Sequence, residues 1–167
     1  IYSFVSLNAQ EYDEVSVGAG YSKQTFYKLS DGSSVSINND AWDIAFSSAG
    51  QTDGGVFINE SSSSTVQGLK LFLANITNWS EAITDLSVFV DSLIIYNPEK
   101  NWKEGAFNTV KNPNSPFDYG WGAYNPQTYS VDGNKIFVIK LRNEEFLKFQ
   151  VIKLSGADYT FRYAKLD

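Results

Sequence analysis

The sequence DYGWGAYNPQTYS, residues 118–130, holds the features that decide how this chain folds. Tyr119, Trp121 and Ala123 alternate with two glycines, so one face of a strand would carry aromatic rings and the other no side chains. A glycine within a strand marks a bulge or a place where something approaches the backbone closely. That neighbour is either a flat ligand or another strand, and aromatic packing at the end of a sheet is the simpler interpretation.

Two turns are predicted beside this aromatic segment. Asn125-Pro126 is typical of a turn, and the Val-Asp-Gly-Asn run at residues 131–134 predicts a second one. Residues 127–130 would then form a short exposed run between the two turns, with the phenol of Tyr129 near its end.

Alternating apolar and polar residues recur along most of the chain and predict an all-β, mostly antiparallel domain with at most short helices. Strands are expected at residues 1–13, at 14–29 with a hairpin return at 33–37, and at 42–46, 56–59, 135–141, 147–151 and 159–164. Residues 135–141 are apolar on both faces, which places that strand centrally. Residues 77–91 show helical spacing and predict one short helix.

The same alternation predicts which side chains are buried and which are exposed. The expected buried residues are Trp42, Ile44, Phe46, Ile139, Phe149 and Phe161. Asp43 lies between two of them and must be solvated or hydrogen-bonded. Lysine and arginine are expected on the charged outer face of the sheet, or alternatively as a small strip that attracts carboxylates, at Lys140, Arg142, Lys148 and Lys153.

Composition narrows the classes of function. A length of 167 residues predicts one domain over residues 1–167. The chain contains no Cys, His or Met, which excludes disulfides, zinc-thiolate sites, a Ser-His-Asp triad and the common haem ligands other than tyrosine. The net charge is −6 without a cluster of Lys or Arg, so nucleic acid is not an expected partner. The chain starts at Ile1, and we expect that a targeting segment has been removed.

The acidic residues do not predict catalysis or a metal site. No spacing selects a catalytic pair among Asp43, Asp53, Glu99, Glu104, Asp118, Glu144 and Glu145. Asp31-Gly32 and the Asp-Gly-Gly run at residues 53–55 lack the repeated oxygen ligands of a calcium loop. Acidic residues in such positions are typical of solvated turns, and we expect that the protein is not an enzyme.

Residues 99–117 form a long segment without a clear secondary-structure pattern, and loops of this length are often functional. Its aromatic residues, Trp102, Phe107 and Phe117, stand in polar surroundings. They would either grip a flat ring or a sugar, or cap the core beneath the loop. The sequence leaves both interpretations open.

Four segments together resemble the HmuY-like haemophore family of bacterial outer-membrane lipoproteins. They are residues 42–46, 118–125, 136–141 and 159–164, and their order and separations match the family from about Val15 to the C-terminus. The resemblance implies a single all-β domain of the HmuY-like type whose hairpins clamp haem at one end. It also implies delivery of haem to an outer-membrane receptor. The protein would be attached to the cell surface by a lipid anchor upstream of Ile1, or secreted.

The resemblance further implies where haem would bind. The best-known members ligate the iron through two histidines and others use methionines, but this chain has neither residue type. Tyr129 falls where a family histidine stands and is the implied iron ligand, and Tyr96 lies in the region of the other. Trp102 and Tyr124 are further predicted haem-binding residues, because both lie in aromatic segments set among turns. Two functions stay open: capture of haem or a related tetrapyrrole, with tyrosine or no side chain on the iron, or recognition of a glycan or protein by a fold that has lost haem binding.

Overall fold

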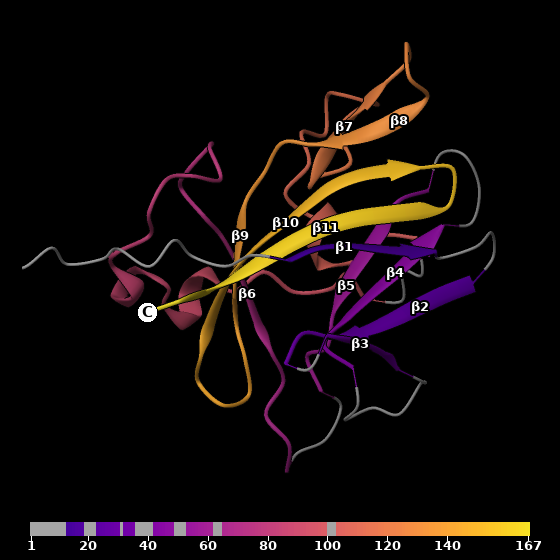
Figure 1. Ribbon diagram of the computed structural model, residues 1–167. Coiled ribbons are helices and arrows are strands. Elements are labelled where there is room, and N and C mark those ends of the chain that lie inside the picture. Colours follow the sequence, from indigo (N-terminus) through magenta and orange to yellow (C-terminus); the bar gives the residue numbers. More distant parts are fainter. Residues whose placement is uncertain are drawn as a thin grey trace, which may run out of the picture.

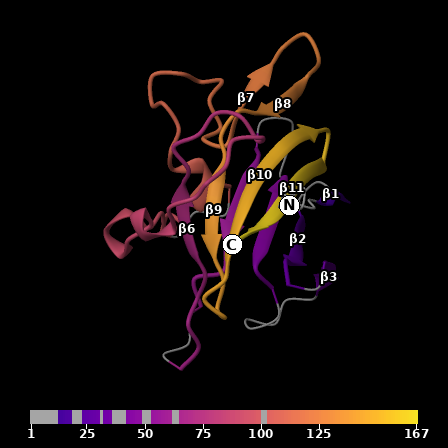
Figure 2. The same ribbon diagram turned by 60° about the vertical axis from the view of Figure 1, so that its left-hand side comes forward.

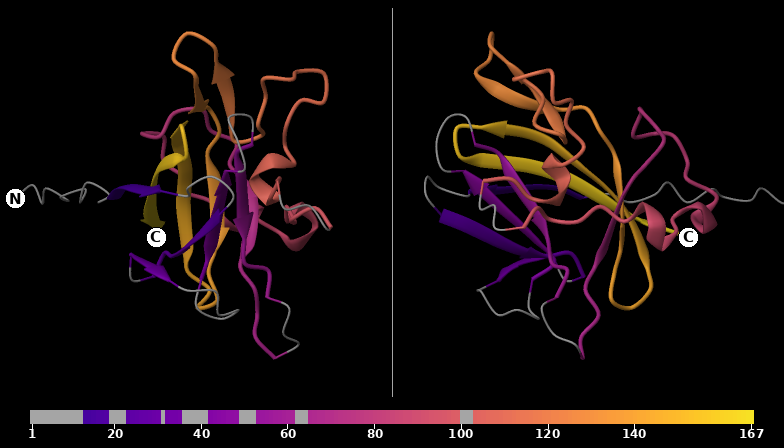
Figure 3. Two further views of the ribbon diagram at one scale, coloured as in Figure 1. Left: turned by 90° about the vertical axis from the view of Figure 1, so that its right-hand side faces the viewer. Right: turned by 180° about the vertical axis from the view of Figure 1, so that it is seen from behind.

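The computed structural model describes residues 13–18, 23–30, 32–35, 42–48, 53–61, 65–99 and 103–167, which form two antiparallel β-sheets. Within this part of the chain, sheet A consists of β1 (Asp13–Gly18), β6 (Lys70–Leu73), β7 (Gly122–Asn125), β8 (Ser130–Gly133), β9 (Phe137–Lys140), β10 (Phe146–Ser155) and β11 (Asp158–Leu166). Sheet B consists of β2 (Lys23–Lys28), β3 (Ser33–Val35), β4 (Ile44–Ser48) and β5 (Gly55–Ile58). The two sheets pack face to face (Figures 1 and 3), and the predicted all-β class is confirmed.

Rings from both sheets meet in the core. Phe161 of β11 stacks on Phe46 of β4 with 5.0 Å between ring centroids, and Phe149 of β10 lies 5.5 Å from Phe161. Five of the six side chains predicted to be buried are buried. The prediction for Trp42 is wrong, because this ring is only half-buried and packs edge-on against Phe26 at the margin of sheet B.

The alternation over residues 14–29 does not form one continuous strand. Strand β1 pairs with β11 in sheet A, whereas β2 pairs with β4 and β3 in sheet B. Strands β1 and β2 each have one apolar face, because both sheets contribute to the same core. Their period-2 patterns therefore follow each other in the sequence like the pattern of one long strand. The β2–β3 hairpin is confirmed, whereas the strand expected at residues 1–13 lies outside the described residues except for Asp13.

Strand β10 has two different partners along its length, and this divides sheet A. Residues 146–149 pair with β9, whereas residues 153–155 pair with β8. The register between β10 and β11 shifts between Val151 and Lys153, which marks a β-bulge. The β7–β8 hairpin therefore separates from β9 and projects beyond the rest of sheet A (Figures 1 and 2).

The turn predicted at residues 131–134 is wrong, because most of this run belongs to β8. The glycine in it serves close packing instead. A Cβ atom on Gly133 would lie 1.7 Å from the carbonyl oxygen of Val151, so only glycine fits where β8 approaches β10. The predicted central position of residues 135–141 is confirmed, since β9 pairs with both β6 and β10.

The helix predicted at residues 77–91 is also wrong. The segment holds the short 3-10 turn η1 (Leu86–Val88), and η2 (Asp91–Leu93) follows. The carboxylate of Asp85 accepts the backbone N–H of Ser87 at 3.0 Å, which favours a turn over a continuing helix. The apolar residues pack instead on the outer face of sheet A, where Trp79 and Phe89 join a cluster around Phe72. No helix in the described ranges is both long and apolar enough to pass through a membrane.

The predicted outer face of basic residues is wrong in one respect. Lys148 is buried, and its ammonium donates to the carbonyl oxygen of Glu81 at 2.6 Å beneath the ring of Trp79. Arg142 instead forms an ion pair with Asp43, whose second carboxylate oxygen accepts the N–H of Leu29 at 2.8 Å. The prediction that Asp43 is hydrogen-bonded is therefore confirmed.

Candidate functional site

The β7–β8 hairpin ends in a tight, internally bonded loop. Asn125 and Ser130 face each other across the strands, with residues 126–129 between them. Asn125 accepts the N–H of Gln127 at 3.0 Å and donates to Asp132 at 3.1 Å, while the Ser130 hydroxyl donates to Asp132 at 3.0 Å. The turn predicted at Asn125-Pro126 is confirmed, and the hairpin tip is held in one conformation.

Tyr129 lies at this tip and projects into solvent. Its side chain is 78% exposed, and its backbone has φ of +54°. The left-handed region is unfavourable for a bulky side chain, so this conformation is imposed by the loop. With Tyr124 and Leu154, Tyr129 lines a hollow of about 390 Å³ between the hairpin and the β10–β11 turn.

Beside the hairpin, the chain from Phe117 folds back against β7. The N–H of Tyr124 donates to the carbonyl oxygen of Phe117 at 2.8 Å, and Asp118 forms a bridge with Ala123. This contact stacks the rings of Phe117 and Tyr124, with 6.1 Å between centroids and 15° between planes. Phe117 is 54% exposed, so an apolar ring remains available to a ligand.

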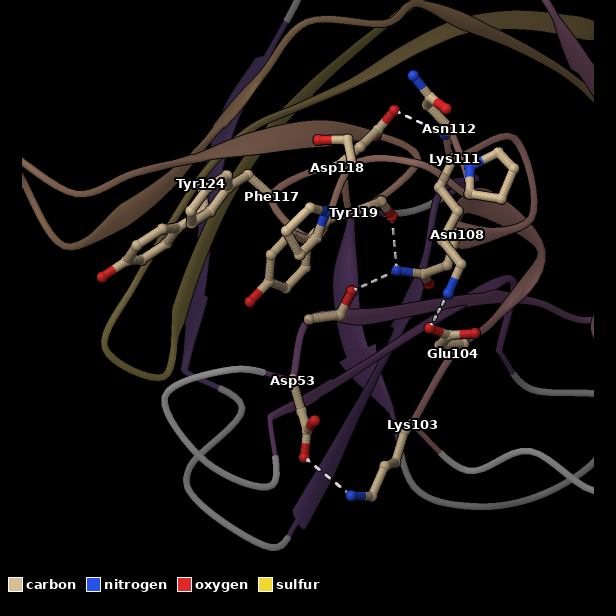
Figure 4. Close-up of a pocket in the computed structure, with 14 residues that line it drawn as sticks. Asp53, Lys103, Glu104, Asn108, Lys111, Asn112, Phe117, Asp118, Tyr119 and Tyr124 are labelled. Atoms are coloured by element: carbon tan, nitrogen blue, oxygen red, sulfur yellow. Dashed lines mark hydrogen bonds and ion pairs between the residues drawn. The ribbon is translucent and has the colours of Figure 1, made fainter.

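A pocket of about 670 Å³ opens between this aromatic pair and the segment before it (Figure 4). Its size falls within the ~300–1,000 Å³ typical of small-molecule sites. Its aromatic wall consists of Phe117, Tyr119 and Tyr124. Its charged wall consists of Asp53, Lys103, Glu104 and Lys111. Gly54, Asn108, Asn112, Pro113, Ser115, Pro116 and Asp118 complete the lining.

Two asparagines fix the long loop against β5, the edge strand of sheet B. Asn97 accepts the N–H of Ile58 at 3.2 Å and donates to its carbonyl oxygen at 2.7 Å, as a paired strand would. Asn108, at the end of η3 (Ala106–Asn108), accepts the N–H of Val56 at 3.0 Å. The interpretation of the loop aromatics as a cap on the core is confirmed for Phe107, which is fully buried. Phe117 is exposed at the pocket, and its contact with a flat ring or a sugar stays a prediction.

The two glycines of the DYGWGAY segment make room for other parts of the chain. A Cβ atom on Gly122 would lie 2.6 Å from the carbonyl oxygen of Asp132 in β8. Gly120 has φ of +88° and faces the η3 turn, where a Cβ would lie 2.5 Å from the carbonyl oxygen of Phe107. Trp121 between them is fully buried and donates to the carbonyl oxygen of Gly54 at 2.9 Å. The interpretation as aromatic packing at the end of a sheet is confirmed for Trp121.

The ionisable groups at the pocket differ in their partners: the lysines form ion pairs, whereas Asp118 is bound mainly by backbone N–H groups. Lys111 forms an ion pair with Glu104, and Lys103 lies 3.8 Å from Asp53. Burial opposes the charge of Asp118, but the N–H groups of Asn112 and Gly120, both at 2.8 Å, and the Lys135 ammonium at 3.5 Å hold its pKa below the usual range.

Tyr119 differs from Tyr129 in its surroundings. Burial raises the pKa of the Tyr119 phenol, and the nearby Asp53 carboxylate raises it further. Its ring packs edge-on against Trp121 with 6.3 Å between centroids. Tyr119 therefore remains a protonated phenol that packs against the core, whereas Tyr129 is the tyrosine presented to solvent at the hairpin tip.

The structure brings together only part of the predicted haem site. Tyr124 and Tyr129 line the same hollow, and Tyr124 also lines the larger pocket. Tyr96 is 58% exposed beside the bridge between Ile95 and Leu71, and it lines neither of these two sites. Trp102 lies outside the described residues, although its neighbour Lys103 lines the pocket. These four assignments remain predictions.

Sequence reasoning missed the charged wall. The sequence predicts solvated turns at Asp53 and Glu104 and indicates no role for Lys103 and Lys111. Asp53 precedes β5 while the lysines flank η3, so no local spacing indicates that these groups share a pocket. The one available signal was the length of the segment at residues 99–117.

A two-sheet β domain with an aromatic-walled pocket of this size has the architecture of a small-molecule binding protein. The model of the HmuY protein family matches residues 20–165, and the chain therefore belongs to the HmuY family, a family of binding proteins associated with haem. The resemblance inferred from the sequence is confirmed. No curated protein matches the chain.

Two solved structures share this fold. One is the apo form of an HmuY analog from Tannerella forsythia, with a TM-score of 0.59 and 12% identity, covering 97% of this chain and 99% of that one. The other is a predicted lipoprotein from Bacteroides fragilis, with a TM-score of 0.52 and 13% identity, covering 94% of this chain and 92% of that one. At these identities the likeness establishes the fold alone.

Proposed function

We propose that this protein is a non-catalytic binding protein that captures haem or a related tetrapyrrole beside the β7–β8 hairpin and passes it to an outer-membrane receptor. Membership of the HmuY family supports the ligand class. The observation that carries the proposal is the position of Tyr124, whose ring stacks on exposed Phe117 and borders both the 670 Å³ pocket and the hollow of Tyr129. A flat ligand that covers Tyr124 would therefore meet aromatic side chains from both sides of the hairpin.

Stacking supplies enough free energy for binding without a bond to iron when the cost of association lies in the lower part of its range. Burying about 500 Å² of porphyrin at ~25 cal/mol per Å² contributes about 12 kcal/mol. Association costs ~4–15 kcal/mol, so stacking alone supports binding no tighter than about micromolar. A protein ligand to the iron would add to this.

The chain fits a tyrosinate ligand to iron and no other common one. It lacks His, Met and Cys, and ferric iron is a hard ion that accepts an anionic oxygen ligand. Tyr129 is the candidate, because its phenol is 78% exposed next to Tyr124, whereas the phenol of Tyr119 is held protonated. Tyr129 would hold the iron while the rings of Tyr124 and Phe117 support the porphyrin face.

A haemin titration followed by absorbance tests the proposal. The variant Phe117→Ser removes an exposed ring of the aromatic wall, and we expect it to weaken haemin binding about tenfold. Leu93→Ser is the matched control, since it removes a similarly exposed apolar side chain that lines neither pocket, and its affinity should equal that of the parent.

Two results would contradict the proposal. An effect of Leu93→Ser and none of Phe117→Ser would mean that haem binds elsewhere on the molecule. Absence of haemin binding in the parent protein would instead favour the second candidate, a protein of this fold that recognises a glycan or a protein.

A further inference from the structure

We propose that the charged wall of the pocket is a carboxylate-binding subsite, in which Lys111 and Lys103 bind the acidic side groups of a flat ligand. This inference rests on the proposed function and specifies the ligand class further. The ligand would combine a planar apolar body, which stacks on Phe117 and Tyr124, with one or two carboxylates at its edge. The propionate groups of a porphyrin have this arrangement.

Figure 4 shows the aromatic rings and the ammonium groups on different sides of one pocket. The rings of Tyr124, Phe117 and Tyr119 lie towards the left of the view. The ion pair of Lys111 with Glu104 lies to their right, and the pair of Lys103 with Asp53 lies below them. A rigid ligand that stacks on the rings therefore directs one edge toward the lysines.

The backbone turn between the two lysines is anchored to the aromatic wall. The two lysines flank the η3 turn, whose last residue, Asn108, is buried and bonded at every polar side-chain atom. Asn108 accepts the N–H groups of Val56 and Gly105, and donates to the carbonyl oxygens of Gly54 and Tyr119. The last of these bonds ties η3 directly to the aromatic wall.

The carboxylates that now contact the lysines do not prevent a ligand from binding. The side chains of Lys111 and Glu104 are 37% and 39% exposed, and an exposed ion pair contributes little stability, so it exchanges readily. An ammonium group also has three donors and can hold a second carboxylate beside the first. Lys103 is 52% exposed and lies 3.8 Å from Asp53, beyond ordinary hydrogen-bond distance.

The third carboxylate at the pocket does not compete for these lysines. Asp118 is bound by the N–H groups of Asn112 and Gly120 and by Lys135, which also donates to the carbonyl oxygen of Gly120 at 2.5 Å. Lys135 and Asp118 therefore neutralise each other, and Lys111 and Lys103 are the cations placed to receive an acidic ligand.

The test compares protoporphyrin IX with its dimethyl ester, which has the same ring but no carboxylate. Neither compound contains iron, so the comparison is independent of any iron ligand. For the parent protein, we expect the free acid to bind about tenfold more tightly than the ester at low salt. Added salt should weaken binding of the acid and leave binding of the ester nearly unchanged.

Lys111→Gln removes one charge while keeping a polar side chain of similar shape. It should weaken binding of the acid about fivefold and leave binding of the ester unchanged. The matched control is Lys165→Gln, because Lys165 forms a comparably exposed ion pair with Glu145 that is not at the pocket. This control should bind both compounds as the parent does.

Three outcomes would overturn the inference. If the ester binds as tightly as the acid, the subsite is wrong while the proposed function stands. The subsite is also wrong, and the proposed function still stands, if Lys111→Gln weakens the binding of both compounds equally. The substitution would then act on the fold or on stacking. If neither porphyrin nor haemin binds the parent protein, the proposed function fails and the inference fails with it.

Discussion

At the scale of single residues, two tyrosines near the pocket, Tyr119 and Tyr129, differ in burial and in backbone conformation. Tyr119 is half-buried, packs against Trp121 and borders the pocket with its phenol protonated. Tyr129 is exposed and adopts a left-handed backbone conformation, which costs roughly 1–3 kcal/mol for a residue of this kind. The hydrogen-bonded loop imposes this conformation, and an exposed ring gains little from burial to offset its cost. This supports the prediction that Tyr129 is a ligand-binding residue.

Replacing Tyr129 should stabilise the protein. Tyr129→Asn places a residue that tolerates the left-handed region at this position, and we expect the free energy of unfolding to rise by about 1 kcal/mol. Urea denaturation measures this change. Tyr96→Asn is the control, because Tyr96 is also exposed but does not have a positive φ, and this change should not stabilise the fold. Destabilisation by Tyr129→Asn would show that the ring packs in the folded state.

Asp118 gives a prediction for the effect of pH on stability. Its pKa is lower in the folded state than the ordinary value of 3.8, so its bonds stabilise the fold at pH above about 4. Acidification through the folded pKa protonates the carboxylate and removes this contribution. Asp118→Asn should therefore reduce the free energy of unfolding by about 1 kcal/mol at pH 7 and by progressively less below pH 4.

The measurement is urea denaturation of both proteins between pH 7 and pH 2.5. Asp158→Asn, which removes an exposed carboxylate at the start of β11, serves as the control and should show no such pH-dependent difference. A difference for Asp118→Asn that is the same at every pH would mean that the charge of Asp118 does not contribute.

At the scale of secondary-structure elements, the side chains of Asn97 and Asn108 take the place of a neighbouring strand beside β5. Strand β5 is the edge of sheet B, yet its outward N–H groups at Val56 and Ile58 are bonded by Asn108 and Asn97. This arrangement protects the edge and fixes the loop that forms one side of the pocket. The loop is thus an ordered part of the binding site rather than a simple connection.

Removing the Asn108 side chain should therefore lower both the free energy of unfolding and the affinity of the pocket for its ligand. Asn108→Ala leaves two buried N–H groups without their acceptor, and we expect a loss of about 3 kcal/mol in the free energy of unfolding. Asn112→Ala is the control, because Asn112 lines the same pocket but is exposed. A loss from Asn112→Ala as large as that from Asn108→Ala would show that the loop is not anchored through Asn108.

The strands at residues 42–46 and 159–164 were predicted correctly, because their alternation is local in the sequence. One face of β11 lies in the core, whereas both faces of β4 are buried. Ile44 and Phe46 lie in the main core, and Ala45 packs in a small cluster on the other face of sheet B. Residues 77–91 mislead because Trp79, Ile83 and Leu86 pack on sheet A at spacings that match an α-helix, whereas the segment forms only a short 3-10 turn. The pocket was only partly predictable, since its aromatic wall is local in sequence whereas its charged wall depends on how a loop folds over β5.

At the scale of the whole molecule, the two sheets share one hydrophobic core. Phe161 of sheet A contacts Tyr27 and Phe46 of sheet B, with ring centroids 5.1 Å and 5.0 Å apart. Stability in one sheet therefore depends on the other. This supports the prediction of a single domain, which an unfolding experiment can test.

We expect a single cooperative unfolding transition. Far-ultraviolet circular dichroism and tryptophan fluorescence should give the same urea midpoint, because they report on parts of one unit. Phe161→Leu should lower both midpoints equally, with a loss of about 1–2 kcal/mol. Separate midpoints, or a shift in only one signal, would show that the sheets unfold independently.

The absence of His, Met and Cys from the whole chain leads to the last prediction, which concerns the oxidation state of bound haem. Low-spin haem ligated by two histidines or two methionines, as in the family, cannot form from these side chains, so the ferric complex should be high-spin, with a tyrosinate or water on the iron. Ferric iron promotes loss of the phenol proton, which has a reference pKa of about 10, and ferrous iron does so poorly. Reduction with dithionite should therefore weaken haem binding by about tenfold or more if Tyr129 is the ligand.

Tyr129→Phe isolates the contribution of the bond to iron, because it keeps the ring and removes only the oxygen. In this variant we expect weaker haemin binding, an altered ferric spectrum, and nearly equal affinity for the ferric and ferrous forms, since stacking is insensitive to the charge of the iron. An unchanged spectrum and affinity in Tyr129→Phe would exclude Tyr129 as the ligand. The porphyrin would then be held by Phe117 and Tyr124 alone, and reduction should not release it from the parent protein either.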